Sequence, residues 1–455
     1  MTMPLRPLLL AILAGSSLAA CTSVLGDFSL ADTSADGGAP DATPGADGGD
    51  DASHGPDGSG GGAEGGGGSS EGGGGGSEAG GSDACSGGAC VDVVCPGSET
   101  ACGGTCVDLA SSSSNCGGCG HDCGGPQSQC TNSVCQPQTL LGNIDAPTAF
   151  AIDPASIYFA VDNVLKTCPL AGCVKGGTQL ASYSALGAIT VVGTTLTFAG
   201  TANIGNHPVS NLYTCSLPGC ASPVSIQGAG IAGGFVQSLA VGADLYFLWE
   251  ASLGAQQTST IDQCVGVSGT GCQKLVTIIG DQAPPIAADP QNVYFSSLLA
   301  DAGFEPGGIA ACPGGAACST PKKLINTTGL ALSPTLMVAY GGVVYFVAER
   351  DLGTGGTLYS CPVTGCTEAA SLDTADLGIT SLAVDASGIY FTGTQGSNQG
   401  VFTCPLAGCG SGGAQAVVSQ QPSPNFVATD ANFIYWVNRG PADAGATAAI
   451  LRVAK

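Results

Sequence analysis

A short phrase recurs along residues 148–455 and constrains the fold more than any other feature of the chain. Each copy has an apolar strand, a tight turn and an aromatic strand, and six copies are followed by two closely spaced cysteines. The aromatic position falls on Tyr158, Thr197, Tyr246, Tyr294, Tyr345, Tyr390 and Tyr435, at intervals of 39, 49, 48, 51, 45 and 45 residues. A period of about 40–50 residues with several short strands per unit is typical of a β-propeller. The sequence therefore predicts an all-β chain built around a seven-bladed β-propeller over residues 136–455.

The two ends of this region complement each other. The last repeat has no cysteine pair and stops at residues 449–455, which match a third strand. Residues 138–142 precede the first repeat just as residues 178–182 precede the second. We expect this N-terminal strand to complete the last blade, because closure of the ring removes open sheet edges. If the weak repeat around Thr197 is not a blade, the ring has six blades instead.

The cysteines of the propeller region come as six pairs, each following a short strand and preceding another. Such a position predicts one disulfide across the hairpin between the third and fourth strands of each blade. Exported chains with an even number of closely spaced cysteines commonly form disulfides. The expected pairs are Cys168 with Cys173, Cys215 with Cys220, Cys264 with Cys272, Cys312 with Cys318, Cys361 with Cys366, and Cys404 with Cys409.

Four repeats carry an aspartate five residues before the tyrosine, at Asp153, Asp289, Asp385 and Asp430. Aspartate in a tight turn commonly accepts hydrogen bonds from its own backbone, so we favour this structural role over ion binding. The phrase D-x-x-x-I-Y-[FW] resembles the YWTD propellers of low-density-lipoprotein-receptor relatives, although Thr-Asp does not follow the aromatic residues here. The resemblance covers most of residues 138–455 and implies the propeller fold, but it transfers no site residues.

The N-terminus has the features of an export signal. Arg6 precedes an apolar core, and residues 18–21 read Leu-Ala-Ala-Cys, a small-residue cleavage pattern. This pattern resembles the lipobox of bacterial lipoproteins, which implies a signal peptide over residues 1–20 and a lipid on Cys21. Thr22 in place of an aspartate favours the outer membrane, facing either the periplasm or the exterior. An ordinary signal peptide with a coincidental cysteine is the alternative.

Two segments separate the expected lipid site from the propeller. Residues 21–84 are rich in glycine and serine, contain twelve acidic residues and no Lys or Arg, and should form a disordered tether. Residues 85–135 hold ten cysteines and should form a small module held together by disulfides. The stretch CGGTCVDLASSSSNCGGCGHDC resembles cysteine-rich modules of bacterial surface lipoproteins. A zinc site at Cys116, Cys119 and His121 is an alternative that we do not favour.

Charge excludes several classes of partner. The chain has 34 acidic and 10 basic residues, and no basic stripe is present to pair with phosphates. Nucleic-acid binding and attraction to anionic lipid are therefore not expected. Contact with the membrane should come through the lipid on Cys21 alone.

Candidate binding residues lie between the second and third strands of each blade, on the face opposite the cysteine hairpins. The segments 201–211, 250–260, 297–308, 348–356, 393–400 and 438–447 differ widely in sequence and are expected to be loops, where binding residues often lie. Charged residues in or beside them form the candidate binding rim: Asp162, His207, Glu250, Asp301, Glu305, Glu349, Arg350, Asp351 and Arg439.

These patterns favour a lipid-anchored, monomeric envelope protein whose propeller binds a protein or glycan without catalysis, cofactor or metal. The alternative is a metal-assisted, lactonase-like hydrolase or lyase at the central opening, with Asp162, Asn203, Glu250 and Glu349 as ligands. Against it, the propeller region has one histidine, and the GxSxG, HExxH and P-loop motifs are absent. A purely structural envelope protein is a further alternative.

Overall fold

The computed structural model describes residues 93–455. Its gaps are residues 125–127, 174–175, 205–206, 227–230, 233, 254–255, 268–269, 280–283, 298–307, 316, 326–332, 350–355, 374–376 and 441–446. The predicted signal peptide (1–20), the predicted tether (21–84) and Cys21 lie outside the described residues. Residues Cys95–Lys455 belong to one compact unit. No helix in the described ranges is long and apolar enough to cross a membrane.

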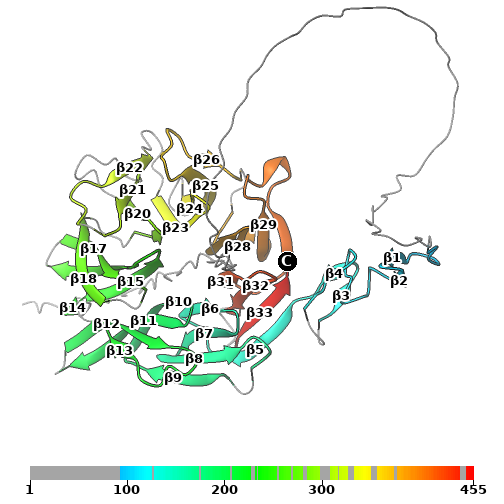
Figure 1. Cartoon of the computed structure of the whole chain (residues 1–455), viewed down its shortest axis with the longest axis horizontal. Coiled ribbons are helices and arrows are strands. Elements are labelled where there is room, and N and C mark those ends of the chain that lie inside the picture. Colours follow the sequence, from blue (N-terminus) through cyan, green and yellow to red (C-terminus); the bar gives the residue numbers. More distant parts are fainter. Residues whose placement is uncertain are drawn as a thin grey trace, which may run out of the picture. The chain divides into compact units, whose positions relative to one another are not determined.

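Seven antiparallel sheets make up the propeller, each built on four strands (Figure 1). In six blades these four strands follow one another along the chain, whereas in blade 7 the outermost strand is β5, which precedes blade 1 in the sequence. Blade 1 contains β6 (Ala149–Ile152), β7 (Ser156–Val161), β8 (Val164–Pro169) and β9 (Thr178–Ser182). Blade 2 contains β10 (Ala185–Val192), β11 (Thr195–Ile204), β12 (His207–Ser216) and β13 (Val224–Ser225), with β14 (Ile231–Ala232) also paired to β12. Blade 3 contains β15 (Gly234–Val241), β16 (Leu245–Leu253), β17 (Gln256–Val265) and β18 (Thr270–Ile279).

The remaining four blades follow the same order. Blade 4 contains β19 (Ile286–Ala288), β20 (Asn292–Ser297), β21 (Gly308–Pro313) and β22 (Lys322–Ile325). Blade 5 contains β23 (Ser333–Tyr340), β24 (Val343–Glu349), β25 (Gly356–Pro362) and β26 (Ala370–Ser371). Blade 6 contains β27 (Ser381–Asp385), β28 (Gly388–Gln395), β29 (Asn398–Cys404) and β30 (Gln415–Ser419), with a 3-10 turn at Gly410–Gly412 between the last two. Blade 7 contains β31 (Pro424–Thr429), β32 (Phe433–Asn438), β33 (Ala448–Ala454) and β5 (Gln138–Ile144).

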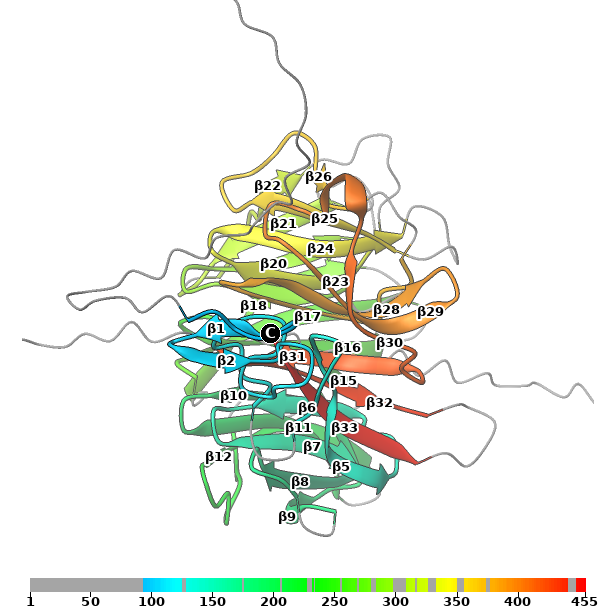
Figure 2. The same ribbon diagram turned by 90° about the vertical axis from the view of Figure 1, so that its right-hand side faces the viewer.

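The first strand of each blade lies innermost, and contacts between successive first strands run from β6 around the ring to β31 and back to β6 (Figures 1 and 2). The ring closes as predicted, because β33 pairs antiparallel with β5, with Ile450 opposite Leu141 and Arg452 opposite Gln138. The prediction of seven blades is confirmed. The six-blade alternative is wrong, because the degenerate second repeat forms a complete sheet around buried Leu196 and Phe198.

Alternate residues of the second strands pack against different neighbouring blades, which explains why both faces of these strands are apolar. In β7, Ile157 and Phe159 join a buried cluster with Tyr435 of blade 7, whereas Tyr158 joins a cluster with Phe198 of blade 2. Side chains of a strand alternate between its two faces, so each blade packs against the preceding blade with one face and against the following blade with the other. The core therefore lies between the blades and not within any one of them.

Aspartates at the turns between first and second strands fix those turns, as the sequence predicts. Asp153 Oδ1 accepts hydrogen bonds from the backbone N–H groups of Ala155 (2.7 Å) and Ser156 (2.6 Å), and its Oδ2 accepts one from the Tyr158 hydroxyl (2.8 Å). Asp289 with Tyr294 and Asp430 with Tyr435 repeat this arrangement. One side chain thus satisfies two turn amides and one buried tyrosine hydroxyl.

Six disulfides span the hairpins between third and fourth strands, at the six cysteine pairs identified in the sequence. Four of these hairpins also bind the preceding blade. The N–H groups of Cys173, Cys318, Cys366 and Cys409 donate hydrogen bonds to the carbonyl oxygens of Leu140, Leu275, Leu324 and Leu372, at 3.4, 3.1, 3.0 and 2.8 Å. Each acceptor leucine lies in or next to the outer strand of the previous blade. The disulfide hairpins therefore connect blades to one another.

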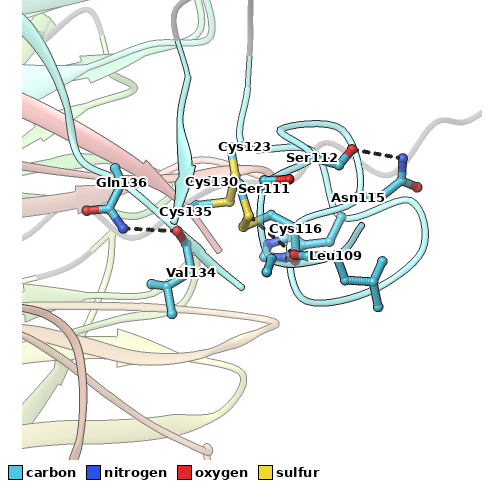
Figure 3. Close-up of a disulfide and its surroundings, with 12 residues drawn as sticks. Leu109, Ser111, Ser112, Asn115, Cys116, Cys123, Cys130, Val134, Cys135 and Gln136 are labelled. Atoms are coloured by element: carbon cyan, nitrogen blue, oxygen red, sulfur yellow. Dashed lines mark hydrogen bonds between the residues drawn. A yellow bond between two sulfur atoms is a disulfide. The ribbon is translucent and has the colours of Figure 1, made fainter. Parts of the chain in front are cut away.

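Residues 95–135 form a module with two short hairpins, β1 (Thr100–Cys102) with β2 (Thr105–Val107) and β3 (Cys130–Thr131) with β4 (Val134–Cys135). Figure 3 shows the region where two of its disulfides, Cys116–Cys130 and Cys123–Cys135, lie close together. The other two join Cys95 to Cys106 and Cys102 to Cys119. Because Cys116 and Cys119 are both oxidised, they offer no thiolate for the zinc site considered above.

The module packs on the blade that closes the ring. Cys116, Cys123 and Cys135 belong to the same buried cluster as Trp436 and Val453 of blade 7. The Arg452 guanidinium donates hydrogen bonds to the Gly124 carbonyl oxygen (3.2 Å) and to Gln138 Oε1 (2.8 Å). It also stacks over the Phe433 ring at 4.4 Å. The strand that completes the ring thus continues directly from a module that is anchored to the same blade.

Candidate functional site

The propeller has two faces that differ in their connections. The hairpin face carries the turns between first and second strands and the disulfide hairpins. The loop face carries the connections between second and third strands and the starts of the innermost strands. Because the hairpin face is nearly uniform from blade to blade, the loop face is where blades can differ without disturbing the ring.

Several connections expected to be loops are strands in the structure. In blade 2, β11 and β12 pair along their whole length up to Ile204 opposite His207, and in blade 3 β16 and β17 pair up to Leu253 opposite Gln256. In blade 6 pairing continues to Gln395 opposite Asn398. Variation between the repeats suggested loops here, but cross-strand pairs are compatible with many different side chains, so strands of different sequence can still pair. The loop face therefore carries long hairpins of different reach.

The predicted rim residues are only partly within the described residues. Asp162 is exposed and, with Asn163, forms the two-residue turn of blade 1, where both residues have positive φ (49° and 63°). That conformation favours Asp and Asn, so Asp162 has a conformational reason to be there. His207 lies at the start of β12 and Glu349 at the end of β24, but their side chains are outside the described set. Asp301, Glu305, Arg350 and Asp351 lie outside the described residues altogether.

Glu250 is the rim carboxylate with the best defined surroundings. It lies in β16 opposite Phe235 of the innermost strand β15, and its Oε2 accepts a hydrogen bond from Gln237 Nε2 (3.1 Å). Phe235 is 53% exposed, which is unusual for an aromatic side chain on the innermost strand of this ring. A bulge between Val236 and Ser238 breaks the alternation of β15 at this point. An exposed ring beside a carboxylate and a carboxamide offers stacking and hydrogen bonding to a ligand.

Arg439 is the rim cation within the described residues. It directly follows β32, and its backbone N–H donates a hydrogen bond to the carbonyl oxygen of Ser423 (3.1 Å), just before the innermost strand β31. Its guanidinium is half-buried and lies over the ring of Phe426 at 5.3 Å. Burial lowers the pKa of this guanidinium from its usual value.

The structure does not favour the metal-dependent alternative. Within the described residues, two groups of potential ligands have donor atoms close together: Cys116 with Cys123 and Cys135, and Asp373 with Cys404 and Cys409. Every cysteine in both groups is in a disulfide. Four residues were considered for a central metal site. Asp162 is a turn residue, and Glu250 accepts a hydrogen bond from Gln237. The side chains of Asn203 and Glu349 are outside the described set.

Among the described residues, three acids are buried away from the rim: Asp262, Asp373 and Asp385. Asp262 lies in the third strand of blade 3, opposite Lys274, and is 9% exposed. Burial raises the pKa of its carboxyl, while the Trp249 indole and the Lys274 charge act to lower it. Because Asp262 is nearly buried and lies opposite Lys274 in the same sheet, we assign it a structural role.

The sequence did not reveal Phe235, Gln237 or Phe426 as candidate site residues. Their roles depend on bulges in innermost strands, which no local sequence pattern reveals. A large aromatic residue in a strand is normally assigned to the core, as Phe426 is, and only the structure shows that Phe235 is exposed.

Comparison with known proteins does not identify a family for this chain. No protein-family model matches the chain, and no curated protein matches its sequence. Among solved structures, the β-propeller domain of the Trilobed protease from Pyrococcus furiosus is 11% identical with a TM-score of 0.48, covering 69% of this chain and 95% of that one. The computationally designed Ika8 protein is 14% identical with a TM-score of 0.41, covering 69% and 98%. A nidogen/laminin complex is 13% identical with a TM-score of 0.33, covering 48% and 77%. At these values the similarities say nothing about ligands.

Proposed function

We propose that this chain is a lipid-anchored protein of the bacterial cell envelope whose propeller binds a protein or glycan partner through its loop face, without catalysis. The observation that carries the proposal is the contrast between the two faces. Disulfides and blade-to-blade hydrogen bonds hold the hairpin face, whereas the loop face varies in hairpin reach and presents exposed Phe235 beside Glu250. A rigid scaffold with variable connections on one face suits recognition.

Disulfides support the cellular location. The described residues contain ten disulfides, and such bonds persist in oxidising compartments outside the cytoplasm. The lipobox-like residues 18–21 support a lipid anchor on Cys21, and Thr22 favours the outer membrane over the inner membrane. We propose that the protein acts as a monomer and does not bind nucleic acid.

A capture experiment tests the binding function. The full chain carrying Cys21→Ser would be immobilised and exposed to envelope extract, and bound proteins and carbohydrates would be identified by mass spectrometry. A loop-face variant, Phe235→Ser with Glu250→Lys, should lose the partner. A hairpin-face variant, Val265→Ser, should retain it, because Val265 is 60% exposed at a disulfide hairpin on the opposite face. No enriched partner, or equal loss with both variants, would contradict binding at the loop face.

Lipid attachment is tested separately. Cells expressing the chain would be labelled with a radioactive fatty acid and fractionated. We expect label in the wild-type chain in the outer-membrane fraction and none in Cys21→Ser. An unlabelled, released wild-type chain would mean that residues 1–20 are an ordinary signal peptide.

A further inference from the structure

Arg439 has an unusual position for a cation in this protein. It lies at the loop face, where the second strand of blade 7 ends beside the start of the innermost strand. Its Nε atom is buried and has no hydrogen-bond partner among the described residues, and no described carboxylate forms an ion pair with it. A buried donor without a partner costs free energy, so such a group calls for an explanation.

The other two cationic side chains at blade 7, in contrast, have hydrogen-bond or ion-pair partners within the protein. Arg452 donates to Gln138 Oε1 and to the Gly124 carbonyl oxygen. Lys455 forms an ion pair with Asp385 and donates to the Asp430 carbonyl oxygen. Residues 136–455 contain 18 acidic and 9 basic residues, so acids are plentiful in this domain. Arg439 nevertheless lies without one among the described residues.

The local backbone holds Arg439 in place. Phe426, whose ring lies under the guanidinium, has φ of +53° in a bulge of β31, a conformation that is a genuine outlier for a bulky residue. The Asn425 side chain supports this bulge by accepting a hydrogen bond from the Phe426 N–H at 2.8 Å. On the other side, Asn438 is fixed by hydrogen bonds with Trp436 and Gln421. Strained backbone that its surroundings hold in place is common at ligand sites.

The required ligand chemistry follows from the guanidinium. Its planar set of N–H donors can form two parallel hydrogen bonds with one carboxylate. Because the guanidinium is already stacked on an aromatic ring, the arginine side chain loses less conformational entropy when that pair forms. A polyuronate would present a carboxylate on every sugar to a domain with a net negative charge, which repels it. A protein can place one carboxylate among neutral groups.

We propose that Arg439 is the anchor for a single carboxylate on a protein partner, either an acidic side chain or a chain terminus. This assignment rests on the proposed binding function of the loop face and narrows it. Phe426 positions Arg439, and the partner supplies the negative charge that the described residues of blade 7 do not.

Arginine side-chain NMR tests this assignment directly, because the chain has only four arginines: Arg6, Arg350, Arg439 and Arg452. The Nε–Hε resonances of the full chain would be assigned with Arg439→Gln and Arg452→Gln. The protein would then be titrated with the blocked peptide acetyl-Gly-Glu-Gly-amide and with its neutral counterpart acetyl-Gly-Gln-Gly-amide. We expect the Arg439 resonance to shift with the glutamate peptide alone and the Arg452 resonance to stay in place. In Arg439→Gln, the accompanying shift of the Gly440 backbone amide should disappear.

Two results would overturn the assignment. One is an Arg439 resonance that does not respond up to the solubility limit of the glutamate peptide, or responds equally to the glutamine peptide. The other is a response to trigalacturonate at lower concentration than to the glutamate peptide, which would indicate an acidic glycan. Envelope capture with Arg439→Gln separates this inference from the proposed function. If the variant captures a protein partner as well as the wild type does, the binding function stands and the role of Arg439 is wrong.

Discussion

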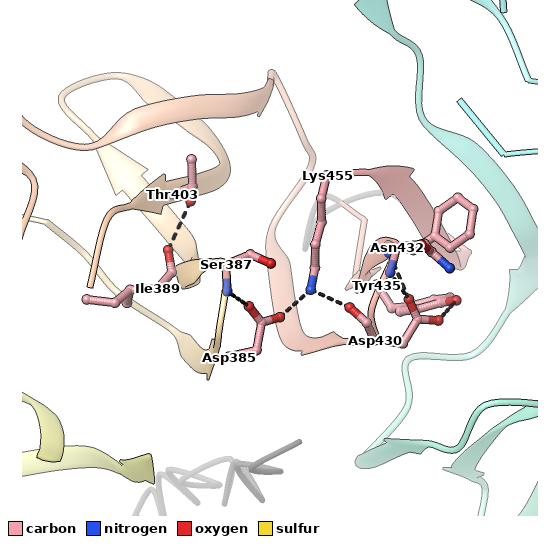
Figure 4. Close-up of polar contacts among 9 residues, drawn as sticks. Asp385, Ser387, Ile389, Thr403, Asp430, Asn432, Tyr435 and Lys455 are labelled. Carbon is pink, nitrogen blue, oxygen red and sulfur yellow. Dashed lines mark hydrogen bonds and ion pairs between the residues drawn. The ribbon is translucent and has the colours of Figure 1, made fainter. Parts of the chain in front are cut away.

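Lys455 and Asp385 form an ion pair that joins the end of β33 in blade 7 to the end of β27, the first strand of blade 6 (Figure 4). Both side chains are nearly buried, with exposures of 11% and 7%. The Lys455 ammonium also donates to the Asp430 carbonyl oxygen and lies 5.2 Å from the centre of the Tyr390 ring. This one side chain therefore connects blades 6 and 7 at the point where the ring closes.

Removal of one partner of this pair should be costly. In Lys455→Met, Asp385 keeps its hydrogen bond from the Ser387 N–H but loses its counter-charge in a buried position. We expect a loss of about 3 kcal/mol in unfolding free energy, measured by denaturant titration. The double variant Lys455→Met with Asp385→Asn should recover part of it, because no buried charge then remains unpaired. A single variant as stable as the wild type would show that the pair contributes nothing to closure.

The contact between the disulfide module and blade 7 should depend on His121. Its Nδ1 lies 2.6 Å from the Cys116 carbonyl oxygen and its Nε2 lies 2.9 Å from the Lys455 carbonyl oxygen. His121→Ala should cost about 1–3 kcal/mol, because at least one of these carbonyl oxygens loses its N–H donor, and hydrogen exchange should rise in β33 and β5. Val134→Ala is the matched control, since Val134 is 52% exposed in the same module. Unchanged exchange in β33 would mean that the module does not protect the closing strands.

The disulfides should not be equivalent. Cys409 donates its N–H to Leu372 of blade 5, whereas Cys220 donates to Ser216 within its own hairpin. Replacing either pair by alanine opens a small loop and should cost about 1–3 kcal/mol. Only the Cys404→Ala, Cys409→Ala variant should speed hydrogen exchange in the neighbouring blade, around Leu372. Faster exchange in a neighbouring blade for the Cys215→Ala, Cys220→Ala variant as well would argue against a specific inter-blade role.

Burial of the repeated tyrosines predicts sensitivity to alkali. Burial raises the pKa of Tyr246 and Tyr390 to about 12, with nearby aspartate charges adding to the effect. Burial and the hydrogen bonds to their aspartates also raise the pKa values of Tyr158, Tyr294 and Tyr435. The unfolded chain loses these protons near pH 10 while the folded chain keeps them, so stability is complete below pH 10 and falls as pH rises toward 12.

Stopped-flow denaturant unfolding between pH 8 and 12 measures this loss, and phenolate absorbance should appear together with unfolding. Tyr294→Phe should make the decline with pH shallower, because one shifted group is removed. A tyrosinate signal that develops fully in the folded protein near pH 10 would contradict the prediction.

How far the sequence predicts this molecule follows from the range of each interaction. Closure of the ring was predictable because residues 138–142 and 449–455 each carry a recognisable part of one repeated pattern. The aspartate turns were predictable because a local side-chain-to-backbone bond determines them. The contact of His121 with Lys455 was not, since it joins residues 334 positions apart that share no pattern.

The candidate site was only partly predictable for a related reason. Variation between repeats marked residues 201–211 and 250–260 as loops, but most of these residues pair with a neighbouring strand in the structure. Glu250 and Arg439 were identified by charge and position alone. Their partners Gln237 and Phe426 depend on bulges in the innermost strands, and bulges arise from the fit between blades.

Two arginines of blade 7 allow the carboxylate anchor to be tested by stability as well. Both stack on phenylalanine rings, Arg439 on Phe426 and Arg452 on Phe433, so their aromatic contacts roughly cancel in a comparison. Arg452→Gln removes hydrogen bonds to Gln138 and Gly124 and should lower unfolding free energy by about 1–3 kcal/mol. Arg439→Gln removes a half-buried charge that has no partner among the described residues. The relief of desolvation should therefore offset the lost stacking, and stability should change by less than about 0.5 kcal/mol or rise. Thermal and denaturant unfolding of both variants measure the difference. If Arg439→Gln lowers the unfolding free energy as much as Arg452→Gln does, the protein itself supplies the partner of Arg439. The guanidinium would then not be available to bind a carboxylate of another protein.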